Sequence, residues 1–227
     1  MSYCRLVRAV ALVIALFSVS SLVPAPADAH ALSFDRSWRE QGFLRLWSND
    51  YQLGGERLDI LSDGTVSLLW RPVPRALWQA DRASWRWAVD QGVRATDLTR
   101  KGGDDRNLAI YFVFVDRASA EKLSRRSARR LLRNQNTRAL VYVWGGDYPP
   151  GTVLESPYGN GLLKTLIARP AGIGAFSESV DLATDYARAF GDPRGVLVGI
   201  GITADSDDTD GRIVASISDL RVDLPDE

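Results

Sequence analysis

The segment TADSDDTDG, residues 203–211, gathers acidic side chains between two apolar runs. Its four aspartates are Asp205, Asp207, Asp208 and Asp210. Negative charges about 4 Å apart repel each other by around 1 kcal/mol even in water, so we expect a partner that offsets this repulsion. Calcium takes oxygen ligands from such loops, which makes Asp205, Asp207 and Thr209 candidate ligands of a Ca²⁺ ion.

Two other interpretations of this loop stay open. Asp210-Gly211 is a turn dipeptide, and aspartate and threonine side chains often bond to nearby backbone amides, so the segment could be a hairpin connection. Alternatively its carboxylates, Asp208 among them, contact a ligand directly. A second acidic pair, Asp104-Asp105, precedes a predicted strand, so it could lie at the end of a sandwich beside the first cluster. We treat this pair as candidate ligand-binding residues as well.

Aromatic side chains supply a second group of candidates. Tyr142 and Trp144 stand at the end of a predicted strand and are followed by two glycines. This position favours a loop rim, where both rings could contact a ligand. Trp85 and Trp87 share one strand face with Val89, so we expect them in the core, although tryptophan pairs can also form a platform for sugars.

Residues 118–134, ASAEKLSRRSARRLLRN, predict a helix that places Ala120, Leu123, Ser127 and Leu131 on one face. The opposite arc would form a continuous cationic surface, made by Arg125, Arg126, Arg129, Arg130 and Arg133. In an exported protein the anionic partners of such a surface are lipid phosphates, lipopolysaccharide or acidic polysaccharide. The alternative is a solvated face whose arginines pair with nearby acids.

Short runs that alternate apolar and polar residues separate these candidates, and this pattern is typical of half-buried strands. The runs cover residues 66–71, 83–90, 107–115, 138–144, 161–168, 195–203 and 211–218, with 43–48 as a weaker candidate. Their spacing predicts a mainly β fold, an antiparallel β-sandwich or jelly roll. Two short helices are inserted, the second over 179–190 and closed by Gly191.

The first residues predict a secretory signal peptide, residues 1–29, with two arginines, an apolar run and small residues before the cleavage site. Residues 30–227 then form a single domain, which is exported to the periplasm or outside the cell. Membrane contact is expected only through the signal peptide or through surface charge. The remaining chain is long enough to bury roughly 70% of its unfolded surface.

Composition excludes several kinds of chemistry. Cys4 is the only cysteine, so the processed chain would have no disulfide, no thiolate metal site and no cysteine nucleophile. His30 is the only histidine, which excludes the usual serine triad unless His30 is its base. The 28 basic and 28 acidic side chains balance, so no overall field attracts nucleic acid.

Several groups of residues, in their order along the chain, resemble one family. They are WRWAVD (85–90), DLTRKGGDD (97–105), IYFVFVD (110–116), VYVW (141–144), SPY (156–158), ESVDLATDYARAFG (178–191) and GIGITADSDDT (199–209). Over residues 35–222 the chain is similar to the family DUF3047, exported bacterial proteins without an established activity. The resemblance therefore implies an exported protein and supplies no catalytic residues.

Three functions remain in view. The first is a non-catalytic exported β-sandwich that binds a glycan or another cell-envelope component through its end loops, with calcium as the one candidate cofactor. The second is a carboxylate-dependent enzyme that acts on polysaccharide, for which many acids are present but no spacing singles out two. The third is a structural or interaction protein of the envelope that uses the arginine-rich helix face.

Overall fold

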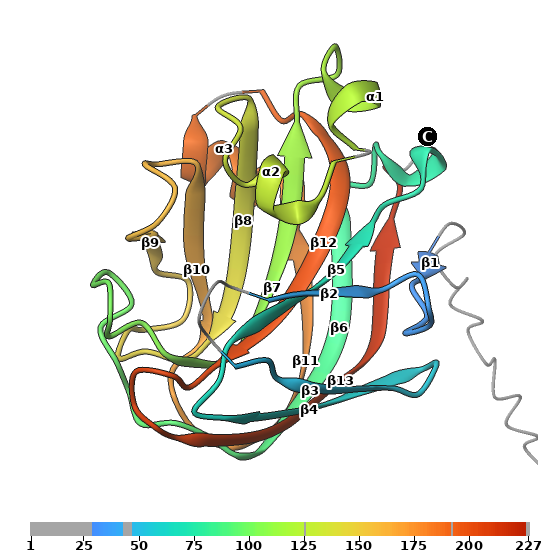
Figure 1. Ribbon diagram of the computed structural model, residues 1–227. Helices are drawn as coiled ribbons and strands as arrows, with labels where there is room; N and C mark the ends of the chain where they lie inside the picture. Colours follow the sequence, from blue (N-terminus) through green and yellow to red (C-terminus); the bar gives the residue numbers. More distant parts are fainter. Residues whose placement is uncertain (1–28, 43–46, 125, 192, 226–227) are drawn as a thin grey trace, which may run out of the picture.

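A computed structural model describes residues 29–42, 47–124, 126–191 and 193–225. In these described ranges two β-sheets face each other, and three short α-helices lie outside the sheets (Figure 1). The predicted signal peptide falls outside the described residues except for Ala29. Within the described part of the chain, no helix is long and apolar enough to cross a membrane.

The six-stranded sheet follows the order β11-β6-β13-β4-β3, and β1 also pairs with β13. Its strands are β1 (Ala29–Ala31), β3 (Asp50–Leu53), β4 (Arg57–Asp63), β6 (Arg82–Gln91), β11 (Gly174–Asp181) and β13 (Arg212–Asp223). All pairs in this sheet are antiparallel.

The seven-stranded sheet follows the order β2-β5-β12-β7-β8-β10-β9. Its strands are β2 (Arg39–Gly42), β5 (Ser67–Pro72), β7 (Arg106–Val115), β8 (Thr137–Trp144), β9 (Val153–Glu155), β10 (Leu163–Arg169) and β12 (Val196–Asp205). A short 3-10 helix, Arg75–Leu77, follows β5. The strand pairs of the seven-stranded sheet are antiparallel, except that β8 and β10 run parallel to each other.

The predicted mainly β sandwich is confirmed, and each of the seven strong strand predictions corresponds to a strand: β5, β6, β7, β8, β10, β12 and β13. Of the weaker candidate 43–48, residues 43–46 lie outside the described residues and 47–48 form no strand. The sequence prediction missed several strands, such as β11, in which most side chains are exposed and none is fully buried.

The core between the sheets follows the period of two. In β7, Leu108, Ile110 and Phe112 enter the core between the sheets, whereas Ala109 and Val113 face the opposite side. Trp85 and Trp87 on β6 are buried in the same core, 1% and 2% exposed, as their spacing predicted. The two indoles meet edge to face, with ring centroids 5.4 Å apart.

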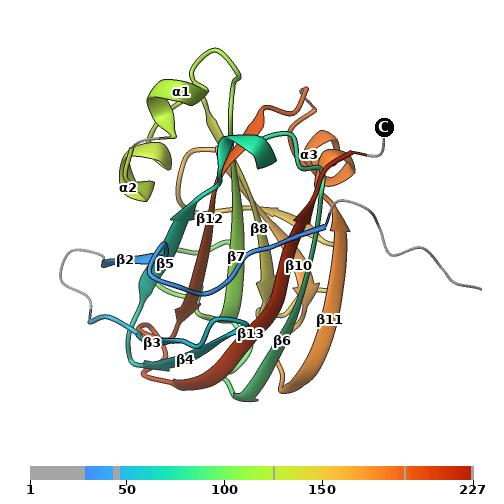
Figure 2. The ribbon, with the colours of Figure 1, turned by 90° about the vertical axis from the view of Figure 1, so that its right-hand side faces the viewer.

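A second apolar layer covers the outer face of the seven-stranded sheet. Two helices, α1 (Ala120–Leu123) and α2 (Ala128–Leu131), lie on that outer side, as the view along the sandwich edge shows (Figure 2). Leu123 and Leu131 pack there with Val113 and Val141. Both faces of β7 and β8 are therefore buried, which explains why these strands are nearly uniformly apolar in sequence.

The single helix predicted over 118–134 is wrong, because α1 and α2 are separate and the backbone of Ser127 is extended, with ψ 151°. Leu123 and Ala128 both bury against the sheet. In one continuous helix, residues five apart would point about 140° away from each other, so both could not face the sheet. The serines at 124 and 127 suit this break, since serine competes for backbone hydrogen bonds.

The second predicted helix is confirmed as α3 (Leu182–Phe190), although residues 179–181 belong to β11. The Asp181 side chain caps its first turn by accepting a hydrogen bond from the Thr184 amide at 2.8 Å. Gly191 ends the helix in the left-handed region, with φ 73°. This helix lies at the end of the sandwich opposite the connection between β12 and β13 (Figure 1).

Strand β12 depends on a close approach between Gly199 and the Trp70 ring, because a Cβ at position 199 would lie 2.0 Å from that ring. We expect Gly199→Ala to lower the free energy of unfolding by about 1–3 kcal/mol through overpacking. Gly172→Ala is the matched control, since its Cβ meets nothing within 4 Å. Urea denaturation measures both, and Trp70→Leu should recover part of the Gly199→Ala loss; equal stability of the two glycine variants would contradict this.

Candidate functional site

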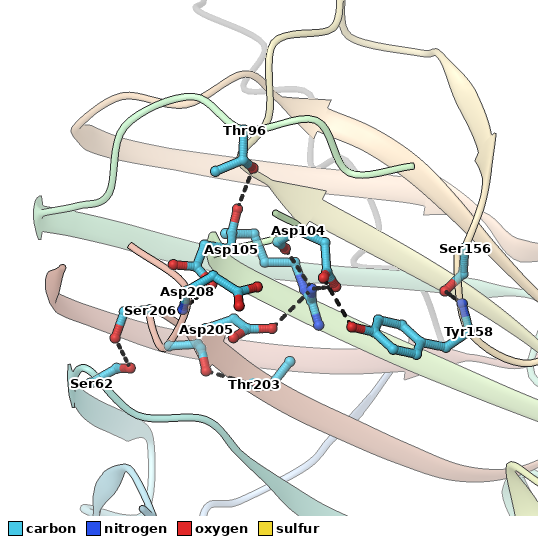
Figure 3. A network of polar contacts seen from close by, with 12 residues as sticks. Ser62, Thr96, Asp104, Asp105, Ser156, Tyr158, Thr203, Asp205, Ser206 and Asp208 are labelled. Atoms are coloured by element: carbon cyan, nitrogen blue, oxygen red, sulfur yellow. Dashed lines mark hydrogen bonds and ion pairs between the residues drawn. The ribbon is translucent and has the colours of Figure 1, made fainter. Parts of the chain in front are cut away.

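Asp104, Asp105, Asp205 and Asp208 lie close together (Figure 3), and Arg106 forms ion pairs with two of these aspartates. Nη1 of Arg106 lies 3.2 Å from Oδ2 of Asp104 and 3.1 Å from Oδ2 of Asp205. Nη2 of the same side chain donates to the Tyr111 hydroxyl at 3.0 Å. The Arg106 side chain is only 13% exposed, so its charge acts in a poorly hydrated environment where both carboxylates are strongly attracted.

The pairing of β7 with β12 explains why two distant acidic segments meet. These strands are antiparallel, and the register places Asp205, the last residue of β12, opposite Arg106, the first residue of β7. Asp104 and Asp105 immediately precede β7, whereas Asp207 and Asp208 immediately follow β12. The start of one strand and the end of its antiparallel neighbour lie at the same edge, so the two segments converge there.

The predicted hairpin between β12 and β13 is wrong, because the two strands belong to different sheets. Residues 206–211 instead cross from one sheet to the other. The turn itself is present: the Gly211 amide donates to the Ser206 carbonyl at 3.2 Å, and Asp210 is left-handed with φ 47°. Asp210-Gly211 therefore supplies the sharp bend that the sequence indicated, in a longer connection.

Asp105 holds this crossing segment in place. Its carboxylate accepts hydrogen bonds from the Asp208 amide at 3.2 Å, the Thr209 amide at 2.8 Å and the Thr209 hydroxyl at 2.5 Å. Its backbone carbonyl accepts from the Thr96 hydroxyl at 2.6 Å. Asp105 is fully buried, so these partners replace the water that its carboxylate loses on folding.

The Asp105 carboxylate lies close to two further carboxylates. Asp105, Asp207 and Asp208 each place one oxygen within 4.8 Å of the others. Burial raises the pKa of Asp205 well above its ordinary 3.8; Arg106 opposes this shift, and the nearby Asp207 adds to it. Burial also raises the pKa of the more exposed Asp208, with contributions from Asp207 and Asp105.

A cavity of about 770 Å³ opens beside these acids on the outer face of the seven-stranded sheet. Its floor includes Leu68, Val141 and Leu163, which belong to the outer apolar layer. Residues from 129–135 and from 156–163 form its walls, so the α2 region and the loop before β10 enclose it. Polar and apolar groups thus share one concave surface, which is typical of a small-molecule or oligomer site.

Tyr158 stands between the cavity and the acidic cluster and was not among the predicted site residues. Its hydroxyl donates to Oδ1 of Asp104 at 3.1 Å, and Lys101 lies over its ring, 5.5 Å from the centroid. Burial and Asp104 raise the pKa of Tyr158 to about 12, so the phenol stays protonated. Tyr158 as a whole residue is 47% exposed. The sequence contained one indication of this residue, the SPY segment, but that segment served only to identify the family resemblance.

The other predicted site residues lie as follows. Tyr142 and Trp144 are buried in the core between the sheets, 3% and 1% exposed, and do not line the cavity. The Tyr142 hydroxyl donates to Asp185 at 2.6 Å on the opposite side of β8. Among the arginines, Arg129 and Arg133 line the cavity. Arg126 and Arg130 are exposed, and Arg125 lies outside the described residues.

Asp205 gives the protein a characteristic pH dependence. Because its pKa is raised in the folded state, the folded chain binds this proton more tightly than the unfolded chain does. We expect its contribution to the free energy of unfolding to be fully present below about pH 4 and to be lost as pH rises through the raised pKa. The loss amounts to about 1.4 kcal/mol for each pH unit that separates the ordinary pKa from the raised one.

Asp205→Asn should remove this decline. Urea denaturation in EDTA across pH 4–8 measures it, as the difference between the wild type and the variant. Asp210→Asn is the control, because it removes an exposed carboxylate from the same connection and should keep the wild-type profile. Parallel curves for wild type and Asp205→Asn would contradict the assignment.

Three solved structures are similar to this chain over most of their lengths. The xyloglucanase domain of NopAA, a type three effector from Sinorhizobium fredii, has 11% identity and a TM-score of 0.45, covering 85% of this chain and 96% of that one. Endoglucanase cel12A from Rhodothermus marinus has 13% identity and a TM-score of 0.46, covering 87% and 96%. The family 11 xylanase from Neocallimastix patriciarum has 14% identity and a TM-score of 0.41, covering 86% and 94%.

Among curated proteins, no sequence matches this chain. A family model, described as "Protein of unknown function (DUF3047)", matches residues 36–221. This match spans most of the chain and agrees with the order of segments seen in the sequence. The chain therefore belongs to the DUF3047 family.

Proposed function

We propose that the protein is exported and binds a glycan of the cell envelope in the cavity on the outer face of the seven-stranded sheet. One observation carries this proposal: the cavity joins an apolar floor to a dense set of hydrogen-bonding groups. Sugars present the same combination, since their rings have apolar C–H faces and their edges carry hydroxyl groups. The proposal thus moves the ligand from the end loops alone to the sheet face beside them.

Each part of the cavity has a role in this proposal. The half-exposed ring of Tyr158 offers a face for a sugar ring to stack on. Asp104 and Asp207 can accept hydrogen bonds from sugar hydroxyls. Arg129 and Arg133 can donate to hydroxyl or carboxylate oxygens, which would favour an acidic glycan. A few polar groups placed around an apolar surface in this way give a site its specificity.

The arrangement of charges favours binding over catalysis. The two carboxylates nearest the buried arginine both contact Nη1 of Arg106, so its guanidinium stands between them. In a glycosidase this space receives the scissile bond or the attacking water. Asp104 and Asp205 therefore serve first to neutralise Arg106 and to hold the ends of β7 and β12 together.

Removing the Tyr158 ring tests the binding proposal. Tyr158→Ala should weaken glycan affinity about tenfold, because stacking and one hydrogen bond are together worth about 1.4 kcal/mol. Glycan arrays and polysaccharide pull-downs find the ligand, and isothermal titration calorimetry measures the variants. Tyr148→Ala is the control, since this tyrosine also donates to an aspartate, Asp97, but does not line the cavity.

Two results would contradict glycan binding. The first is that purified protein retains no glycan or envelope polysaccharide, with or without calcium. The second is that Tyr158→Ala and Tyr148→Ala weaken binding equally, which would point to a general loss of stability and away from the cavity.

A carboxylate-dependent hydrolase is the second candidate, and the raised pKa of Asp205 beside a second carboxylate is the observation that favours it. Oδ2 of Asp104 and Oδ2 of Asp205 both lie within 3.2 Å of one nitrogen, so they are at most about 6 Å apart, a limit that allows the separation of about 5–5.5 Å found in retaining glycosidases. The raised pKa of Asp205 suits a general acid, and Asp104 would then act as the carboxylate partner.

An assay of polysaccharide hydrolysis tests whether the protein is such a hydrolase. If the pair is catalytic, Asp205→Asn and Asp104→Asn should each lower the hydrolysis rate by at least about 100-fold, the smallest effect typical of a general acid or base. The activity of wild-type protein should also follow the ionisation of Asp205. Reducing-sugar release from a panel of plant and bacterial polysaccharides measures it, with Asp210→Asn as control. No release from any substrate would remove the hydrolase candidate and leave glycan binding intact.

A further inference from the structure

We propose that the acidic end of the cavity is a divalent-cation site, with Asp105, Asp207 and Asp208 as ligands and Ca²⁺ as the ion that fits. The site joins two segments that are far apart in sequence, the one before β7 and the one after β12. The proposal does not depend on glycan binding, because it concerns what the folded chain holds by itself.

The spacing of the carboxylates suits one ion. One oxygen from each of the three residues lies within 4.8 Å of the other two. Calcium binds oxygens at about 2.3–2.6 Å, so two ligands of one ion are at most about 5 Å apart. All three donors are oxygens on irregular backbone, which calcium accepts because its coordination is flexible, whereas magnesium demands a near-ideal octahedron.

An unsatisfied buried oxygen gives independent support. Oδ1 of Asp205 is buried and receives no hydrogen bond from any described residue. Asp205 is only 7% exposed, and the nearby Asp207 carboxylate disfavours its negative charge. Two neighbouring carboxylates only accept hydrogen bonds and repel each other, so a cation beside them is favourable. A cation held by Asp207 would satisfy both groups.

The surrounding charges do not supply that cation from the protein. Arg106 is already shared by Asp104 and Asp205. Among the described residues, no lysine or arginine lies within ion-pair distance of Asp105, Asp207 or Asp208. The three carboxylates therefore carry negative charge that no described arginine or lysine side chain neutralises, and Asp105 among them is buried. This uncompensated charge favours the binding of a metal ion.

The loop is already shaped to receive the ion. Asp105 fixes the crossing segment through the amides of Asp208 and Thr209, so these ligands do not have to be ordered on binding. Asp208 is exposed and Asp207 half-buried, which leaves room for water or for a ligand hydroxyl to complete the coordination. The Thr209 hydroxyl donates to the Asp105 carboxylate, so it helps to hold this ligand in position.

Calcium titration of metal-free protein tests the proposal. After treatment with EDTA and desalting, CaCl₂ at neutral pH should raise the melting temperature saturably by several degrees, because the ion binds only the folded chain. Isothermal titration calorimetry should show one site. NaCl at matched ionic strength should have little effect, and MgCl₂ a smaller one than calcium. Absence of a calcium-specific shift would overturn the proposal.

Asp207→Asn makes the test sharper, because it should stabilise the metal-free protein and also abolish the response to calcium. Without metal the variant should melt higher than wild type, since its amide can donate to Oδ1 of Asp205 and one negative charge is lost. With calcium it should gain nothing. Asp208→Asn should weaken calcium binding at least tenfold, and it alters an exposed side chain that folding does not depend on.

The control is Asp210→Asn, which removes a carboxylate from the same segment and keeps a residue that tolerates its left-handed backbone. It should bind calcium as the wild type does. A calcium shift that persists in both Asp207→Asn and Asp208→Asn would place the ion elsewhere and overturn this site. Stabilisation by Asp207→Asn without any calcium response in wild type would show a shared proton in place of the metal. Glycan binding, measured separately, can fail without affecting these results.

Discussion

The ion pairs of Arg106 are the interaction on which the rest of this site depends. A guanidinium that is 13% exposed can stay charged at little cost only if acceptors replace its water, and Asp104, Asp205 and Tyr111 do so. These contacts join the start of β7, the end of β12 and the loop before β7. The acidic cluster and the cavity beside it occupy the space that this joint creates.

Much of the fold follows from simple patterning in the sequence. Strand β6, which buries one face, alternates clearly and was located within two residues, whereas β13 was recognised but ends five residues beyond the predicted run. The two acidic segments were also recognisable, because closely spaced aspartates stand out from their apolar flanks. Their meeting was only a possibility at that stage, since it depends on the pairing of β7 with β12, a contact between residues about 100 positions apart.

Other features could not be read from the chain alone, for specific physical reasons. Both faces of β8 are buried, so its sequence does not show which residues face inward. Tyr142 and Trp144 turned out to face the core, whereas Val141 lines the cavity. The helix over 118–134 had suitable periodicity, yet packing against the sheet split it at Ser124–Ser127. The 206–211 turn looked local, although its strands lie in different sheets.

That last connection has a consequence for the molecule as a whole. The six residues from 206 to 211 bridge the two layers of the sandwich, and Asp105 fastens them to the seven-stranded layer. Whatever rigidifies this bridge therefore also resists separation of the layers. A ligand or ion that bound to this bridge only in the folded protein would therefore raise the free energy of unfolding of the whole β-sandwich, and not only of the bridge.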